Sequence, residues 1–99
     1  MTSMEYRNFV LKYNRATFKE ICSGLAFETK ELLGLIKTRD KHKESISEDR
    51  IKDECGDLLF YLISFLVDEG LTIEEVMSSN AAKVKANIPW DFRVDRTQQ

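Results

Sequence analysis

Proline and glycine, the residues that most often interrupt regular structure, are scarce in this 99-residue sequence, which has one proline and four glycines. No alternating run of β-branched residues is present either, so strands are hard to place. The composition therefore predicts an all-α protein. No segment approaches the roughly 20 apolar residues that a membrane span needs, and no apolar signal region follows the first residues. We expect no membrane association and a cytoplasmic location.

Cysteine and histidine, the common ligands of zinc and iron, are also rare. The two cysteines, Cys22 and Cys55, show no C-x-x-C or Cys/His spacing, which argues against a zinc site or a disulfide framework. His42 is the single histidine. A di-iron four-helix protein needs Glu-x-x-His from two helices, so one chain cannot supply that ligand set.

An excess of positive charge is lacking as well. Fifteen lysines and arginines face 17 aspartates and glutamates, for a net charge of −2. This balance argues against a general nucleic-acid surface, which is strongly basic. The length predicts a single domain over residues 1–99 with a modest core, which a partner subunit would extend.

Apolar residues at helical spacing predict four helices. We expect these helices over about Met4 to Asn14, Thr17 to Thr38, Ser47 to Asp68, and Thr72 to a point before Pro89. Ser3 and Ser47 are the expected caps of the first and third helices, and Gly70 is the expected stop of the third. Thr72 and Glu75 form a T-x-x-E capping box. The charged segment from Arg39 to Ser45 is predicted to be an exposed loop.

The predicted inner faces follow from the same periodicity. The expected buried residues are Phe9, Val10, Tyr13, Phe18, Ile21, Cys22, Leu25, Leu32, Leu35, Ile36, Ile51, Leu58, Leu59, Leu62, Phe65 and Leu66. Gly56 costs a helix about 1 kcal/mol relative to alanine, and we expect it to allow another backbone to approach closely.

Two acidic pairs lie on the second and third predicted helices. Glu28 and Glu31 are three residues apart, as are Glu54 and Asp57, so each pair projects from one helix face. These faces are also the apolar ones, and antiparallel packing across a short loop can bring both pairs into one cluster. Two carboxylates about 6 Å apart repel by roughly 3 kcal/mol at an effective dielectric constant near 20. Such a cluster therefore needs a neutralising partner.

Protons, lysines or a divalent cation could neutralise these acids. All-oxygen ligation favours Mg²⁺, with Mn²⁺ as a substitute and water at the remaining positions. The competing interpretation is a solvated helix edge on which the acids pair with Lys30, Lys37 or Lys52. The pattern alone leaves both interpretations open.

Three segments together resemble a known family. They are GLAFETKELLGLIKTRDKHK, DRIKDECGDLLFYLISFLVDEGLTIEEV and NAAKVKANIP, and they cover most of the chain. They resemble the MazG-like nucleoside triphosphate pyrophosphohydrolases of the all-α NTP pyrophosphatase superfamily, whose hallmark is E-x-x-E, a spacer, and then E-x-x-D. Glu28 and Glu31 match the first pair, and Glu54 and Asp57 match the second.

The resemblance implies an antiparallel four-helix bundle that forms a homodimer or homotetramer, with Mg²⁺ held by Glu28, Glu31, Glu54 and Asp57. Members of this family cut a (deoxy)nucleoside triphosphate between the α and β phosphates, releasing the monophosphate and pyrophosphate. The implied function is therefore an enzyme that controls the nucleotide pool. Glu28 and Glu31 are the favoured candidates for the catalytic base.

The segment NAAK matches the family's N-x-x-K, so Asn80 and Lys83 are expected to contact the phosphates or the sugar. Lys37 is a further candidate for phosphate binding. Many members carry an arginine four residues after the lysine of N-x-x-K, and this chain has Asn87 at that position, four residues after Lys83. The alternative function is therefore a catalytically degenerate helical protein that binds a nucleotide or another subunit without turnover.

Overall fold

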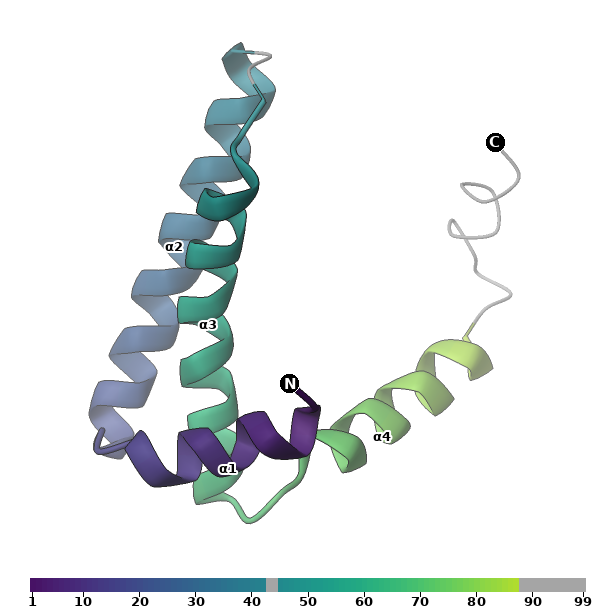
Figure 1. Cartoon of the computed structure of the whole chain (residues 1–99). Helices are drawn as coiled ribbons and strands as arrows, with labels where there is room; N and C mark the ends of the chain where they lie inside the picture. Colours follow the sequence, from purple (N-terminus) through teal and green to yellow (C-terminus); the bar gives the residue numbers. More distant parts are fainter. Residues whose placement is uncertain (43–44, 88–99) are drawn as a thin grey trace.

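The computed structural model describes residues 1–42 and 45–87, which form four helices and no strand (Figure 1). The helices are α1 (Ser3–Tyr13), α2 (Phe18–His42), α3 (Glu48–Asp68) and α4 (Ile73–Ala86). The predicted all-α class with four helices is confirmed. None of the helices in the described ranges combines the length and the apolar composition that crossing a membrane requires.

Three of the four helices begin with the same reciprocal cap. In each, a threonine hydroxyl accepts a hydrogen bond from the backbone N–H of a glutamate three residues later, whose carboxylate accepts from the threonine N–H. The pairs are Thr2 with Glu5, Thr17 with Glu20, and Thr72 with Glu75. These bonds satisfy N–H groups that the first turn of a helix leaves without partners, which explains where the helices start.

The helix bounds confirm most of the prediction and correct two parts of it. Ser47 caps α3 and Gly70 ends the turn after it, with a φ of 72° that glycine adopts without strain. Thr2, not Ser3, caps α1, because Thr2 has the partner Glu5. The expected loop from Arg39 was wrong, because α2 continues to His42. A polar helix without an apolar face can persist as an extension of a longer one, since propagation is easier than nucleation.

The four helices are not wrapped into one closed bundle within a single chain. Figure 1 shows α2 and α3 as a long antiparallel pair, with α1 crossing its base and α4 extending away from the pair on the side opposite α2. Two hydrogen bonds join α1 to α4 and to the connection before it: the Ser3 hydroxyl donates to Glu74 on α4 (2.9 Å), and the Arg7 Nε donates to the Leu71 carbonyl just before α4 (3.3 Å). The molecule thus has an upright α2–α3 pair and a lower α1–α4 arm.

A small core lies where α1 crosses α3. Val10, Ile63 and Leu66 are buried there, and Tyr6 and Phe60 pack against them among partly buried neighbours. The core is smaller than predicted, since many residues expected inside are exposed in the single chain. These are Phe9, Tyr13, Phe18, Cys22, Ile36, Ile51, Leu59 and Leu62. Ile63 and Ser64 were missed, although both are buried.

The glycines also correct one prediction. Open space surrounds Gly56, with no other backbone close to it in the described part of the chain. The close approach occurs instead at Gly24 on α2, where a Cβ would collide with the ring of Tyr61 on α3. Gly24 therefore lets the two long helices pack tightly, as glycine does wherever a side chain would block an approach. Cys22 and Cys55 are both free and exposed.

Candidate metal centre

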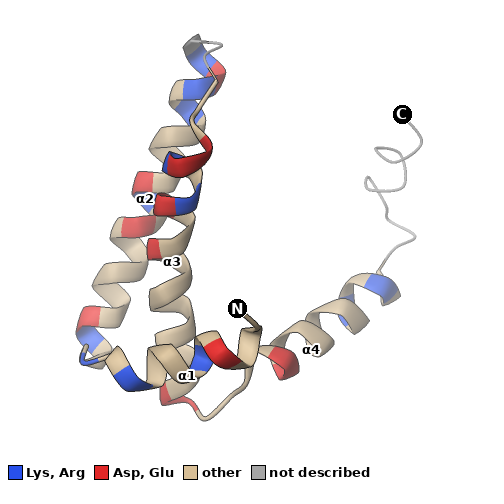
Figure 2. Ribbon diagram, in the orientation of Figure 1, with Lys and Arg blue, Asp and Glu red and all other residues tan. Residues whose placement is uncertain are grey.

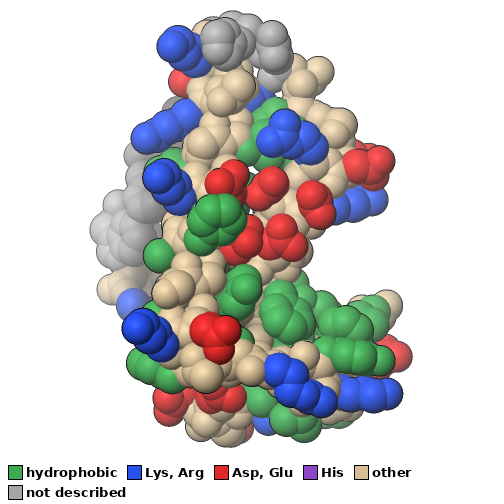
Figure 3. All heavy atoms as spheres, turned by 90° about the vertical axis from the view of Figure 1, so that its left-hand side faces the viewer, with side chains coloured by type: hydrophobic (Ala, Val, Ile, Leu, Met, Phe, Trp, Pro, Cys, Tyr) green, Lys and Arg blue, Asp and Glu red, His purple; other side chains and the backbone are tan. Residues whose placement is uncertain are grey.

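The carboxylates of Glu28, Glu54 and Asp57 converge between the two long helices. One oxygen from each of these side chains lies within 4.8 Å of the others. Glu28 projects from α2, while Glu54 and Asp57 project from the same face of α3, one turn apart. Figure 2 shows acidic residues on neighbouring stretches of α2 and α3, and Figure 3 shows acidic side chains gathered into one group on this face. We call Glu28, Glu54 and Asp57 the carboxylate group.

Glu28 is the member with the most perturbed environment. Burial raises the pKa of its carboxyl group above the usual value, and the negative charges of Asp57, Glu54, Glu31 and Asp53 raise the pKa further. Both causes act in the same direction because desolvation and like charges each disfavour the ionised form. In the absence of a cation, Glu28 therefore keeps its proton to a higher pH than an ordinary glutamate does.

Within residues 1–42 and 45–87, no lysine or arginine forms an ion pair with the carboxylate group. Among the described residues, the ion pair that the structure contains joins Lys52 to Glu48, at 3.6 Å, on the solvent-facing side of α3. Both of these side chains are highly exposed, so the pair contributes little to stability. Lys52 therefore does not neutralise Glu28, Glu54 or Asp57 as the competing interpretation suggested, because its ammonium group forms an ion pair with Glu48.

Glu31 lies one turn beyond Glu28 and outside the carboxylate group. Its side chain is exposed, yet its charge still raises the pKa of Glu28. A groove of about 350 Å³ runs beside Glu31, and Lys30 and Arg50 also line it. The groove thus brings the Glu31 carboxylate together with two cationic side chains, toward the α2–α3 loop from the carboxylate group.

The donor chemistry of the carboxylate group fits a hard divalent cation. Three oxygens from two helices can converge on one ion, and Mg²⁺ takes carboxylate, water and substrate-phosphate oxygens as its ligands. An ion there would also remove the repulsion that raises the pKa of Glu28. Glu28, Glu54 and Asp57 are therefore the residues that could hold such an ion directly.

The predicted substrate-binding residues are not close to the carboxylate group in one chain. Asn80 and Lys83 line a separate groove of about 370 Å³ on α4, together with Leu71, Glu75, Val76 and Ser79. Lys37 is exposed on α2 and lies nine residues after Glu28, two and a half turns, on the opposite side of that helix. The single chain therefore does not bring these three residues to the acids, and their role stays a prediction.

Asn87 has a structural role. It is the C-cap of α4, and its side-chain amide donates a hydrogen bond to the Lys83 carbonyl (3.0 Å). The side chain thus satisfies a carbonyl that the end of a helix leaves free. His42 is the last residue of α2, and its side chain lies outside the described part of the structure.

Two residues near the carboxylate group were missed by the sequence analysis. Asp53 adds to the negative charge that acts on Glu28, and it directly precedes Glu54 in the sequence. Tyr6 on α1 is close enough for the charge of Asp57 to raise its pKa, which burial raises first. Adjacency in the sequence could have suggested Asp53. Nothing in the spacing could have suggested Tyr6, because it comes from another helix.

Comparison with known families places these residues in context. The sequence matches the MazG nucleotide pyrophosphohydrolase domain over residues 16–92, which is most of its length. The chain belongs to this family. No curated protein and no solved structure matches it. The match includes α2, α3, α4 and all four predicted acidic positions, while α1 lies outside it.

Proposed function

We propose that this chain is a divalent-metal-dependent hydrolase that cleaves a (deoxy)nucleoside triphosphate between the α and β phosphates. The observation that carries the proposal is the convergence of Glu28, Glu54 and Asp57 from two helices, in a chain of the MazG nucleotide pyrophosphohydrolase family. The family supports a nucleoside triphosphate as the substrate. The products would be the monophosphate and pyrophosphate, and the role would be control of the nucleotide pool.

In this proposal Glu28, Glu54 and Asp57 hold the cation, which is Mg²⁺ or its substitute Mn²⁺. When bound, such an ion offsets phosphate charge and lowers the pKa of water. Lys30 and Arg50 lie beside Glu31 and suit the outer phosphates, because a guanidinium or ammonium group pairs with phosphate oxygens. We extend the predicted phosphate contacts to these two residues.

Glu31 is our candidate for the general base. Both Glu28 and Glu31 were predicted for this role, but Glu28 lies inside the group that would hold the ion, and Glu31 lies one turn outside it. A carboxylate that is not a ligand keeps an oxygen free to accept the proton of the attacking water. Water then adds across the α–β anhydride, the bond to the bridging oxygen breaks, and pyrophosphate leaves.

Assembly would complete the site. The 14-residue helix α4 has no buried residue, and its Val76 and Met77 are exposed. A short helix gains most of its stability from packing an apolar face, so we expect α4 to pack against another subunit. We propose a homodimer or homotetramer, in which Asn80 and Lys83 would act at the acids of a neighbouring copy. Static light scattering should give a mass of at least twice the 11.5 kDa of the chain.

The test of the activity is product analysis. Purified protein is incubated with each common ribo- and deoxyribonucleoside triphosphate and Mg²⁺, and monophosphate, diphosphate, pyrophosphate and orthophosphate are resolved. Monophosphate with pyrophosphate supports the proposal. Diphosphate with orthophosphate would show that a different bond is cut. Nucleotide binding without any product would favour the alternative function, a catalytically degenerate protein that binds nucleotides. The presence of Asn87 where many family members carry an arginine is the reason for this alternative.

The role of Glu31 can be separated from that of the ion-binding acids. Glu31→Gln should lower kcat by about 10²- to 10⁴-fold while Mn²⁺ affinity, measured by calorimetry, stays close to that of the wild type. Glu54→Gln should lose both catalytic activity and Mn²⁺ affinity. If Glu31→Gln lost Mn²⁺ affinity to the same extent as Glu54→Gln, Glu31 would be a ligand and not the base.

A further inference from the structure

The exposed aromatic face of α1 is the feature that the family match leaves unexplained, because the match begins at residue 16. Tyr6, Phe9 and Tyr13 follow one another at steps of three and four residues, so their rings lie along one side of the helix. The Tyr6 and Phe9 rings are stacked, with centroids 6.0 Å apart and planes 19° apart, and those of Phe9 and Tyr13 are 4.8 Å apart. We call these three residues the aromatic ladder.

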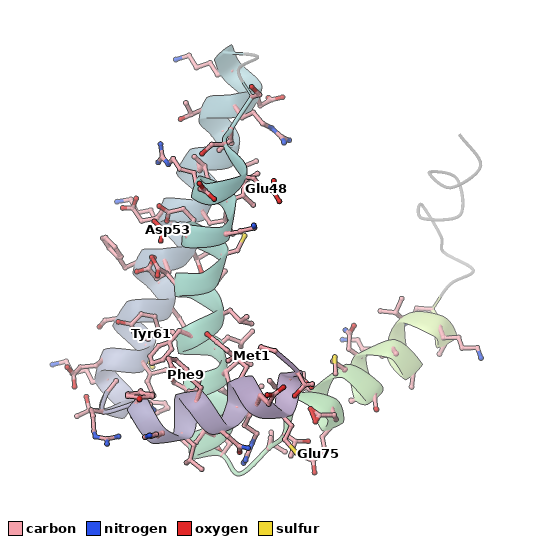
Figure 4. The ribbon with its side chains drawn as sticks, in the orientation of Figure 1. Met1, Phe9, Glu48, Asp53, Tyr61 and Glu75 are labelled. Carbon is pink, nitrogen blue, oxygen red and sulfur yellow. The ribbon has the colours of Figure 1, made fainter. Side chains whose placement is uncertain are left out.

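The inner end of the aromatic ladder packs against α3, the helix that carries two of the three members of the carboxylate group. Tyr6 packs against the core formed by Val10, Ile63 and Leu66, and the negative charge of Asp57 reaches it. In Figure 4, Phe9 lies in the corner between α1 and the α2–α3 pair, below Tyr61, which follows Asp57 by one turn of α3. The ladder therefore runs along α1, which crosses the base of the helix pair that carries the acids (Figure 4).

The outer end of the ladder remains open to solvent. Phe9 is 42% exposed and Tyr13 is 55% exposed, although Val10 of the same helix is fully buried. Figure 3 shows a hollow whose upper wall carries the acidic side chains and whose floor is formed by hydrophobic side chains. A hollow with charge on one wall and hydrophobic side chains on the floor (Figure 3) suits a ligand with a polyanionic end and a planar apolar end.

We propose that the aromatic ladder of α1 is the nucleobase-binding surface of this chain, with Phe9 as the ring on which the base stacks. The inference rests on the proposed function, which places the phosphates of the same substrate at the carboxylate group. A nucleoside triphosphate carries its base and its phosphates at opposite ends, so it needs two adjoining surfaces of opposite character. Stacking tolerates every base because each has a π face, so the ladder binds purines and pyrimidines alike.

Binding of an analogue that cannot be cut tests this surface without depending on turnover. The probes are an α,β-methylene nucleoside triphosphate and inorganic tripolyphosphate, each titrated calorimetrically with Mn²⁺ into wild type, Phe9→Ala, Phe9→Trp and Leu11→Ala. Leu11 is the matched control, since it is 55% exposed on α1 but lies two residues from Phe9, on the other side of the helix.

Phe9→Ala should raise the Kd of the nucleotide analogue by about 5- to 150-fold, which corresponds to the loss of one base–aromatic stack. Its Kd for tripolyphosphate should be unchanged, Phe9→Trp should restore nucleotide affinity, and Leu11→Ala should behave as wild type. An equal loss for both probes, or no loss for either, would overturn the inference. A fall in the oligomeric mass of Phe9→Ala without a change in nucleotide affinity would assign the ladder to a subunit interface, and so would also overturn it.

The outcome is separable from that of the proposed activity. If wild type binds the analogue but releases no monophosphate from a hydrolysable nucleotide, the hydrolase proposal fails while the binding comparison still decides the role of Phe9. If wild type cuts nucleotides and Phe9→Ala cuts them with unchanged KM and kcat, the hydrolase proposal stands and the ladder has no part in it. Tyr13→Ala provides a second variant, exposed and outside the core, in case Phe9→Ala perturbs folding.

Discussion

The upright α2–α3 pair and the lower α1–α4 arm differ in the side chains that they bring together: the pair gathers carboxylates, and the arm packs apolar residues against α3. The pair places three carboxylates within 4.8 Å of one another and leaves them without a lysine or arginine partner in the described part of the chain. The arm meets α3 through an apolar contact that contains Val10, Ile63 and Leu66. The difference indicates that the arm stabilises the fold, whereas the pair carries repulsion that a ligand is expected to relieve.

The largest expected effect is on the pair. Glu54→Gln removes one charge from the carboxylate group and should lower nucleotide hydrolysis by at least about 100-fold, because even residues that only orient metal ligands cost 10- to 100-fold. The measurement is kcat/KM with saturating Mg²⁺. Glu48→Gln makes the same chemical change on the same helix, outside the group and within the exposed pair with Lys52, and should keep full activity. Equal activity in the two variants would exclude Glu54 from the site.

On the arm, the expected effect is on stability. Ile63 is 2% exposed in the α1–α3 core, so Ile63→Ala should lower the free energy of unfolding by about 2–5 kcal/mol. The neighbouring Leu62 is 44% exposed, and Leu62→Ala should cost clearly less in urea denaturation. Equal costs would show that the single-chain core is not where the stability lies, and that an interface covers Leu62.

The junction of the two long helices gives a smaller effect of definite sign. Gly24→Ala would push a methyl group into the Tyr61 ring and should destabilise the fold by about 1–3 kcal/mol. Gly34 lies on the same helix with open space around it, so Gly34→Ala should stabilise the fold by up to about 1 kcal/mol. Thermal melts of both variants decide the matter, and a destabilising Gly34→Ala would contradict this account of the packing.

The pH dependence should be the smallest effect. Because the pKa of Glu28 is raised in the folded state, the folded protein holds a proton that the unfolded chain has released at pH values between 4.5, the usual glutamate pKa, and the raised pKa. Stability of the metal-free protein should therefore rise as pH falls through this window. Thermal unfolding measured in the presence of a chelator, from neutral pH down to about 4.5, should show this rise in stability for wild type. The stability of Glu28→Gln should depend less on pH over the same range. A parallel response in both variants would assign it to other groups.

Sequence patterns predicted the helices well because their ends are local. Thr72 with Glu75 and Ser47 with Arg50 are contacts within one turn, so residue types at fixed spacing reveal them. The caps at Thr2 and Thr17 follow the same T-x-x-E rule and could have been predicted from it. The end of α2 was missed because a charged segment without apolar residues resembles a loop, although a preceding helix can extend through it.

The arrangement of the helices was beyond the sequence patterns. Periodicity identifies an apolar face but not what covers it, so Leu59 and Leu62 were predicted to be inside and are exposed in the single chain. The two E-x-x-[ED] pairs correctly suggested that α2 and α3 bring acids together, yet Glu31 lies outside the resulting group. The position of Tyr6 against the α1–α3 core depends on how α1 crosses α3. This contact joins distant parts of the chain, so no local sequence pattern encodes it.

Occupancy of the carboxylate group by a divalent ion is the central claim. A crystal grown with Mn²⁺ and recorded for anomalous scattering tests it most directly. We predict a strong anomalous peak between α2 and α3, within coordination distance of oxygens from Glu28, Glu54 and Asp57. A well-ordered crystal in which these oxygens turn apart into solvent, with no peak between the helices, would contradict it.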